Sequence, residues 1–276
     1  MPDTACSYRL KLSNGQGWNI LSDEHNRAWT ERFASILNLS TVTSDEESFM
    51  LTFVRNQKDK SEGSPGVHIE VPANLNRKAS VFTMWKSILP IYKQAIMAKG
   101  VPIHSALIEH DKKGFLLAAP GGTGKTTCCN RLPTDWNAHC DDETLLVWNG
   151  EDNSYKGHPF PTWSNFYLDR PPWDWEVERS LQVNGIFFLQ QSKVDSIEYL
   201  GQGKSAALIY QASSQICRRI WNELDSGQSE ELKKHLFTLA GDVARQIPAF
   251  ILNVSLDGMF WELIADASAS AERLRS

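Results

Sequence analysis

The chain has 276 residues, of which 41% are hydrophobic, so it can bury a sizeable core and form one large domain or one domain with a small appendage. Its net charge of −5 argues against non-specific nucleic-acid binding, which depends on clustered Lys and Arg. No apolar run is long enough to span a bilayer, and the first residues lack the apolar segment of a signal peptide. We therefore expect a soluble, cytoplasmic protein that contacts neither membrane nor nucleic acid.

Residues 1–80 are expected to form a small β-rich lobe. Alternating apolar residues over 8–12 predict a strand, and the turn signal at Asn14 and Gly15 lets residues 18–21 return as its partner. The same reasoning predicts strands at 49–54 and 67–71 and a helix at 26–37.

A larger domain is expected over residues 81–276, joined to the lobe by a helix at 77–99 that Pro90 should kink. Next come a strand at 101–109, a charged turn and a second apolar strand that ends at Ala118. This tight hairpin differs from doubly wound nucleotide-binding folds, which connect their strands through helices.

The second strand of the hairpin leads into a glycine-rich loop, APGGTGKT, with the layout of a phosphate-binding loop. Its glycines lack a Cβ and allow the backbone to wrap a phosphate, while Lys125 supplies a cation for the β- and γ-phosphates and Thr126 a hydroxyl for Mg²⁺. Ala119 replaces the usual first glycine, which leaves the phosphate-facing part intact. The competing interpretation is an ordinary turn with an exposed lysine. The expected nucleotide-binding residues are Gly121, Gly122, Thr123, Gly124, Lys125, Thr126 and Thr127.

An acidic pair, Asp141 and Asp142, follows the loop at the edge of a short strand over 145–148. Successive side chains of a strand point to opposite faces, so the two carboxylates can divide the roles of metal ligand and general base. The alternative is a helix cap or turn, where Asp is common.

Together these features resemble the HPr kinase/phosphorylase-like proteins, whose nucleotide-binding core is akin to that of phosphoenolpyruvate carboxykinase. The resemblance covers residues 100–265 and rests on the strand with His104, the hairpin, the glycine-rich loop, the acidic pair, and the later segments VNGIFFLQQ and IPAFILNVSLDGMFWELI. Within this group the chain is similar to the SynChlorMet type of cassette protein that accompanies modified ribosomal peptides. The resemblance implies an α/β fold with a P-loop kinase core and a small N-terminal β-rich lobe.

Carried over by position, the resemblance makes Asp141 the acceptor of the proton from the attacking hydroxyl. Asp142 would hold Mg²⁺ together with Thr126, although the two roles can be exchanged between the carboxylates. His104 matches a family histidine near the phosphates, where it would orient or stabilise the transferred group. The structural alternative is a core histidine whose hydrogen bonds are satisfied within the protein. The glycine- and arginine-rich loop of bifunctional members is not evident here, so the resemblance does not extend to phosphorolysis.

Two further residue clusters have both a functional and a structural interpretation. Zinc binding by Cys128, Cys129, His139 and Cys140 is weighed against buried thiols, which we favour because adjacent cysteines rarely reach one zinc ion. The aromatic segment 158–175 either lines a groove for a peptide or small protein substrate or packs on its own core. Its candidate contacts are Trp163, Phe166, Tyr167, Trp173 and Trp175.

The remaining elements are a buried strand at 184–189, a strand at 250–254, and helices at 206–224, 229–246 and 259–274. Arg218 and Arg219 could face either solvent or a phosphate, and we favour a solvated helix face. Ser229 is assigned to a helix N-cap. The triplet Gly203-Lys204-Ser205 resembles the end of a phosphate-binding loop. It lacks a preceding apolar strand, so it is assigned to the start of a helix.

These observations predict an ATP- and Mg²⁺-dependent kinase that phosphorylates a hydroxyl, foremost a serine of a peptide or protein. A nucleotide-dependent scaffold in a ribosomal-peptide maturation complex is the alternative, and a simple ATPase is a third possibility. Assembly into homo-oligomers is left open, because no heptad or interface patch in the sequence supports a particular number.

Overall fold

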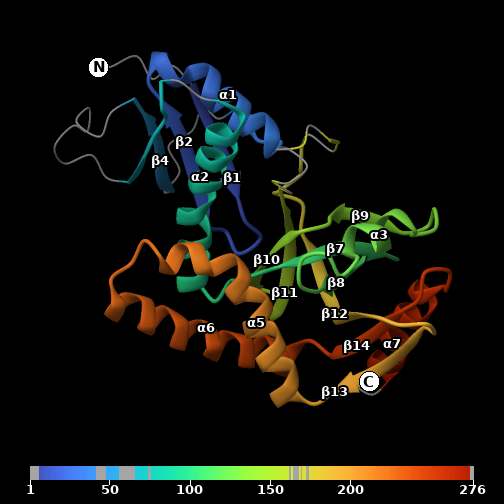
Figure 1. Ribbon diagram of the computed structural model, residues 1–276. Helices are drawn as coiled ribbons and strands as arrows, with labels where there is room; N and C mark the ends of the chain where they lie inside the picture. Colours follow the sequence, from blue (N-terminus) through green and yellow to red (C-terminus); the bar gives the residue numbers. More distant parts are fainter. Residues whose placement is uncertain are drawn as a thin grey trace. The chain divides into compact units, whose positions relative to one another are not determined.

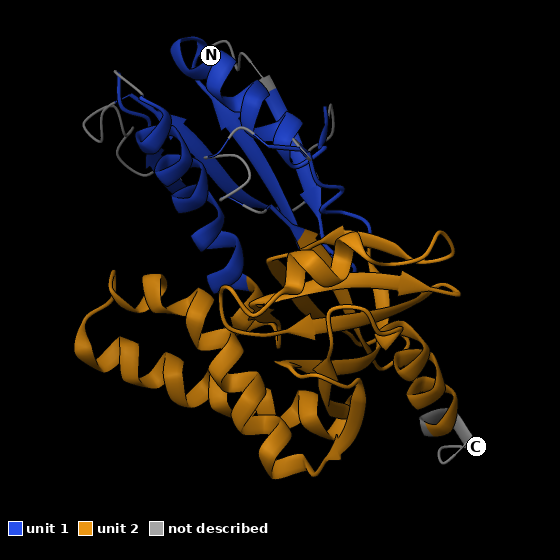
Figure 2. Ribbon diagram, turned by 45° about the vertical axis from the view of Figure 1, so that its right-hand side comes forward, with its two compact units in different colours: residues 1–94, 160–179 blue, residues 95–159, 180–276 orange. Residues whose placement is uncertain are grey.

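The computed structural model describes residues 6–41, 48–55, 66–73, 76–161, 163, 168, 170–171 and 174–273. The chain divides into two compact units, shown in Figure 2. Unit 1 comprises residues 1–94 and 160–179, and unit 2 comprises 95–159 and 180–276. Unit 1 thus runs past the predicted boundary at residue 80, through most of the helix that begins at Arg77, and also takes in residues 160–179.

Unit 1 contains a five-stranded sheet of order β3-β1-β2-β4-β5. The predicted hairpin pairs β1 with β2, and its turn contains Gly15 at a positive φ of 84°. The strands β2, β4 and β5 are mutually parallel. The elements of this unit are β1 (Cys6–Lys11), β2 (Gly17–Ser22), α1 (Arg27–Ile36), β3 (Ser40–Thr41), β4 (Phe49–Val54), β5 (Val67–Glu70) and most of α2 (Arg77–Met97).

Both described tryptophans of the aromatic segment belong to unit 1 and are buried. Trp163 and Trp175 are only 6% and 2% exposed. The backbone N–H of Trp175 donates to the carbonyl of Ile36 at the end of α1, at 2.8 Å. These two side chains are therefore buried, as the packing interpretation of the aromatic segment expects. Phe166, Tyr167 and Trp173 lie outside the described residues.

Unit 2 is built on a nine-stranded sheet in which β12 is the longest strand (Figure 1). The strand β12 pairs in parallel with both β8 and β14, and β14 continues to β13. The strands are β6 (Val101–Ile103), β7 (Ser105–His110), β8 (Lys113–Ala118), β9 (Asn137–Cys140), β10 (Glu143–Asn149), β11 (Ser154–Phe160), β12 (Leu181–Gln191), β13 (Ser196–Leu200) and β14 (Ala249–Val254).

The predicted hairpin before the glycine-rich loop is confirmed as the antiparallel pair β7 and β8. Its turn places Asp111 and Lys112 at positive φ values of 49° and 63°. Two consecutive left-handed residues match the right-handed twist of the flanking strands, as in a type I′ turn. A short polar turn thus joins the two strands directly, without a crossover helix.

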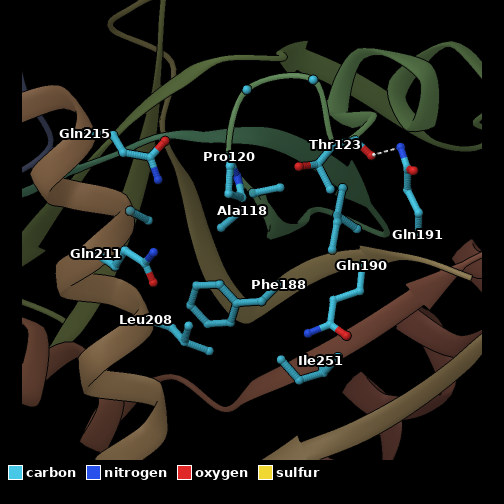
Figure 3. Close-up of a pocket in the computed structure, with 15 residues that line it drawn as sticks. Ala118, Pro120, Thr123, Phe188, Gln190, Gln191, Leu208, Gln211, Gln215 and Ile251 are labelled. Atoms are coloured by element: carbon cyan, nitrogen blue, oxygen red, sulfur yellow. Dashed lines mark hydrogen bonds between the residues drawn. The ribbon is translucent and has the colours of Figure 1, made fainter.

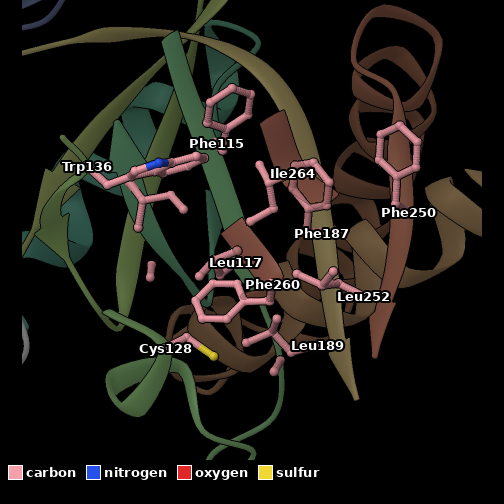
Figure 4. Close-up of a cluster of buried hydrophobic side chains, with 13 residues drawn as sticks. Phe115, Leu117, Cys128, Trp136, Phe187, Leu189, Phe250, Leu252, Phe260 and Ile264 are labelled. Carbon is pink, nitrogen blue, oxygen red and sulfur yellow. The ribbon is translucent and has the colours of Figure 1, made fainter. Parts of the chain in front are cut away.

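Helices cover both faces of the central strands of unit 2. Figure 4 shows the apolar side chains of one face, where Phe115, Leu117 and Phe187 of the sheet pack with Phe260 and Ile264 of α7 (Phe260–Arg273). The opposite face carries α5 (Gln202–Trp221), which pairs with α6 (Ser226–Gln246). The predicted N-cap at Ser229 is wrong: α6 begins earlier, and the side chain of Asp225 caps it by accepting from the backbone N–H of Gln228.

The parallel direction of β8, β12 and β14 brings three distant segments to one edge of the sheet. Residues 119–124 follow β8, residue 192 follows β12 and residues 255–258 follow β14. In open α/β sheets this carboxyl edge is where ligands bind. The functional site of unit 2 is therefore expected at this edge.

Candidate functional site

The glycine-rich loop connects β8 to the short helix α3 (Lys125–Asn130). Gly122 and Gly124 have positive φ values of 79° and 113°, a region that residues with a Cβ rarely adopt. At Gly121 a Cβ would meet no atom within 4 Å, so open space lies beside the loop. The predicted order of strand, glycine-rich loop and helix is confirmed.

Lys125 is not the exposed lysine of an ordinary turn, because it is only 6% exposed. Its Nζ donates to the carbonyl of Ala119 at 2.9 Å and lies 2.9 Å from Nε2 of His104. Burial lowers the pKa of the Lys125 ammonium, although the charges of Asp142 and Asp141 act in the opposite direction. A buried cation thus stands at the base of the loop, where an anion would stabilise it.

His104 occupies the residue between β6 and β7 and connects Lys125 to two further side chains. Its Nε2 lies 2.8 Å from Oδ1 of Asp142, and its Nδ1 lies 2.5 Å from Oε1 of Gln215 on α5.

His104 therefore contacts both Lys125 and Asp142 through Nε2 and contacts Gln215 through Nδ1, so three polar side chains meet at this one imidazole.

The carboxyl of Asp142 is held in its charged form by this group. Burial raises its pKa, but the hydrogen bond with His104 and the positive charges of His104, Lys125 and Arg219 outweigh burial, so that the pKa of Asp142 is lowered. Arg219 lies on α5, one turn beyond Gln215. Arg218 and Arg219 are both exposed, as expected for a solvated helix face. The charge of Arg219 nevertheless contributes to the lowered pKa of Asp142.

Thr126 contacts the other member of the acidic pair. Its hydroxyl donates to Oδ2 of Asp141 at 2.6 Å. The sequence had grouped Thr126 with Asp142 as the metal ligands and made Asp141 the base, whereas the structure pairs Thr126 with Asp141 and leaves Asp142 with His104. Hydroxyl and carboxylate oxygens are the hard ligands that Mg²⁺ prefers, so Thr126 and Asp141 fit that ion.

Of the cysteines near the loop, Cys128 and Cys140 are buried thiols and Cys129 is half-buried. Cys128 and Cys140 are 4% and 5% exposed, and burial raises the pKa of Cys128 to about 11. Burial also raises the pKa of Cys129. His139 pairs instead with Glu109, with Nε2 2.8 Å from Oε2. Among the described residues no group of three or more His, Cys, Asp or Glu side chains is arranged to hold a metal ion.

Two pockets adjoin the glycine-rich loop at this edge. The larger, of about 550 Å³, lies between the first half of the loop and α5 (Figure 3). The smaller, of about 310 Å³, borders α3 at Thr127 and Arg131 and the segment after β14. Thr123, Gln190 and Gln191 line both pockets, and Gln191 Nε2 donates to the Thr123 carbonyl at 3.3 Å, which closes part of the wall between them.

The match to known families spans the whole of this site. The family model of the SynChlorMet cassette protein ScmC matches residues 67–268. The chain belongs to this family. No curated protein matches the chain. The described helices include none that is long and apolar enough to cross a membrane.

In this ScmC family member, sequence patterns did not point to Gln215 at all and favoured a solvated face for Arg219. Gln215 contacts His104, and Arg219 acts on Asp142, yet both come from α5, far along the chain from the glycine-rich loop. Neither belongs to a motif. The available signal is helical spacing, since Leu208, Gln211, Ala212 and Gln215 lie on one face of α5 and all line the larger pocket.

Proposed function

We propose that this SynChlorMet cassette protein is an ATP-dependent kinase of the HPr kinase-like type, which transfers the γ-phosphate to a serine hydroxyl of a peptide. The observation that carries the proposal is the contact chain at the end of the glycine-rich loop. Lys125 Nζ lies 2.9 Å from His104 Nε2, which lies 2.8 Å from Asp142 Oδ1. A cation, an imidazole and a carboxylate thus stand together beside the loop.

The loop and Lys125 supply the electrostatic part of phosphoryl transfer. Gly122 and Gly124 hold the backbone in the conformations that let it approach a phosphate closely. The buried ammonium of Lys125 is destabilised by burial, so an incoming triphosphate would restore a favourable charge balance. Positioning and charge neutralisation account for most catalysis of this reaction.

Thr126 and Asp141 are the residues that would hold Mg²⁺, because their oxygens lie 2.6 Å apart. The ion, when bound, neutralises charge on the phosphate oxygens. This assigns metal binding to Asp141 and reverses the roles first carried over from the resembled family.

Asp142 is the proton acceptor in the proposed step. The hydroxyl oxygen of the substrate serine forms a bond to the γ-phosphorus. At the same time the bond from that phosphorus to the β–γ bridging oxygen breaks, which releases ADP. The hydroxyl proton passes to the Asp142 carboxylate, whose lowered pKa keeps it ionised at neutral pH. His104 then stabilises the protonation change through its contact with Asp142.

The family assignment supports a peptide as the substrate class. The matching model is described as a SynChlorMet cassette protein, and cassette proteins of this type accompany modified ribosomal peptides in the resemblance noted above. A serine side chain of such a peptide provides the hydroxyl that the proposed reaction needs.

The test measures transfer of label from γ-labelled ATP in Mg²⁺ to serine-containing peptides encoded beside the chain's own gene. Wild type is compared with Lys125→Ala and Asp142→Asn, and Lys204→Ala is the matched control. Lys204 also follows a glycine and precedes a Ser, but it is an exposed residue in the first turn of α5. Label should appear with wild type and the control and fall by about 10²–10⁴-fold in the other two variants.

Two other outcomes would reject the kinase. Release of labelled phosphate to water alone, unaffected by any peptide, would identify an ATPase. Tight ATP binding without movement of label would identify a nucleotide-dependent scaffold. Circular dichroism of each variant separates loss of activity from loss of folding.

A further inference from the structure

We propose that the larger pocket beside the glycine-rich loop is the acceptor site, and that it takes an uncharged peptide segment carrying the hydroxyl. This inference rests on the proposed kinase function and names its substrate class. The pocket of about 550 Å³ lies entirely within unit 2. Its size falls in the range of sites that enclose a small ligand, so it exceeds what one serine side chain would fill.

The chemistry of the pocket wall selects against charge. Among the described residues that line it, none is charged. Phe188, Leu208 and Ile251 provide the apolar surface, and Figure 3 shows the amides of Gln190 and Gln211 on either side of Phe188. An ionised acceptor group would lose its hydration here without gaining a partner, which is costly.

The amide side chains fit the polar groups of a peptide. Each glutamine offers two N–H donors and one carbonyl acceptor, so it can bind the N–H and C=O groups of a peptide backbone. The apolar floor then accommodates small or aliphatic side chains of the same segment. These two features together favour a neutral peptide over a sugar, which lacks the apolar part, and over a phosphorylated compound.

The pocket also has the right position relative to the reacting groups. Gln215 lines it and contacts Nδ1 of His104 at 2.5 Å. In a loop of this type the lysine reaches the β- and γ-phosphates, so the γ-phosphate would lie near Lys125 and its neighbour His104. A hydroxyl that enters past Gln215 would therefore meet the phosphate to be transferred.

The nucleoside of ATP can occupy the smaller pocket, so the larger pocket remains available for the acceptor peptide. The smaller pocket borders Thr127 and Arg131 on the opposite side of the loop and can receive the nucleoside. Nucleotide and acceptor then approach from the two sides of Thr123 and Gln191, which line both pockets.

The test uses three capped tripeptides: acetyl-Ala-Ser-Leu-amide and its counterparts with Asp or Lys in place of Ala. Their binding is measured with Mg²⁺ and a non-hydrolysable ATP analogue, and phosphate transfer is measured with ATP. Gln211→Glu places a negative charge in the pocket. Ala207→Glu places the same charge on the same helix at an exposed residue that does not line the pocket.

Wild type should bind and phosphorylate the neutral peptide best. Gln211→Glu should lower kcat/KM for the neutral peptide by about tenfold, shift the preference toward the Lys peptide, and leave the Kd of the ATP analogue within about twofold of wild type. Ala207→Glu should match wild type. The change of preference is the decisive result, because a merely structural defect would lower kcat/KM equally for all three peptides.

The proposal is overturned if wild type prefers a charged peptide or binds none of the three. It is also overturned if Gln211→Glu weakens the ATP analogue as much as the peptide, since the pocket would then belong to the nucleotide. Failure of the kinase function gives a different result: the neutral peptide binds and Gln211→Glu weakens it, but no phosphate is transferred.

Discussion

The two sides of the glycine-rich loop differ in their charge. At its exit, Lys125, His104, Asp141 and Asp142 bring titratable groups within hydrogen-bonding distance of one another or of Thr126. Along its entry, the described residues that line the larger pocket carry apolar side chains, glutamine amides and the hydroxyl of Thr123, and none of them is charged. One short segment thus borders a region suited to moving charge and another suited to recognising a neutral group. The difference indicates that reaction and acceptor recognition can be altered separately.

The largest effect should come from the charged side, where the two carboxylates are proposed to act differently. Asp142→Asn should lower kcat by about 10²–10⁴-fold at any Mg²⁺ concentration, because it removes the proton acceptor. Asp141→Asn should instead raise the Mg²⁺ concentration needed for half-maximal rate. Steady-state rates over a Mg²⁺ series distinguish the two, and identical curves for both variants would contradict the division of roles.

A smaller effect is expected from the arginine whose charge reaches Asp142. Arg219→Ala should raise the pKa of the Asp142 carboxyl and so lower kcat only on the acidic side of the pH profile, because a positive charge that favours the ionised carboxylate is removed. Arg218→Ala is the control, since Arg218 is not among the groups that act on the pKa of Asp142. Equal losses in both variants would assign the effect to the helix as a whole.

A third, weaker effect is expected on ATP binding if the smaller pocket holds the nucleoside. Leu256 lines this pocket and is 82% exposed, so Leu256→Asp should leave the fold intact. The variant should bind Mg·ATP about fivefold more weakly and inorganic tripolyphosphate equally well, because only ATP carries a nucleoside. Calorimetric titration of both compounds provides the measurement, and equal weakening of both would count against the assignment.

The smallest effect concerns stability. Burial lowers the pKa of Lys125 below the 10.5 of the unfolded chain, so between these two values the unfolded state binds more protons and stability rises with pH. The free energy of unfolding of wild type, relative to Lys125→Met, should therefore increase toward pH 10.5, by at most about 1.4 kcal/mol per pH unit for one proton. Urea denaturation across this range tests the sign, and a decreasing difference would contradict it.

Sequence patterns predicted the local elements well because hydrophobic periodicity and turn residues are local signals. The hairpin of β7 and β8 and the strand at 49–54 were found as expected. The return of residues 160–179 to unit 1 was missed, because it depends on long-range contacts such as that between Trp175 and Ile36.

The candidate site likewise combines residues that the local sequence predicted with residues that only long-range packing brings in. Lys125, Thr126 and the acidic pair stand in a recognisable local order, and the structure brings them together with His104. Both aspartates lie in the bend between β9 and β10, and the conformation of that bend, which spacing alone left open, decides which carboxylate contacts Thr126. Gln215 and Arg219 come from a helix whose position over the sheet no local pattern reveals.

The pairing of β14 has a consequence for how the protein is made. This last strand of the chain lies between β12 and β13, so it is flanked on both sides. Unit 1 likewise needs residues 160–179, which follow 65 residues assigned to unit 2 in between, at 95–159. Domains usually fold as their segments leave the ribosome. Here the sheet that holds the glycine-rich loop is incomplete until residues 249–254 have been synthesised, so ribosome-bound chains that end before β14 should lack a finished site.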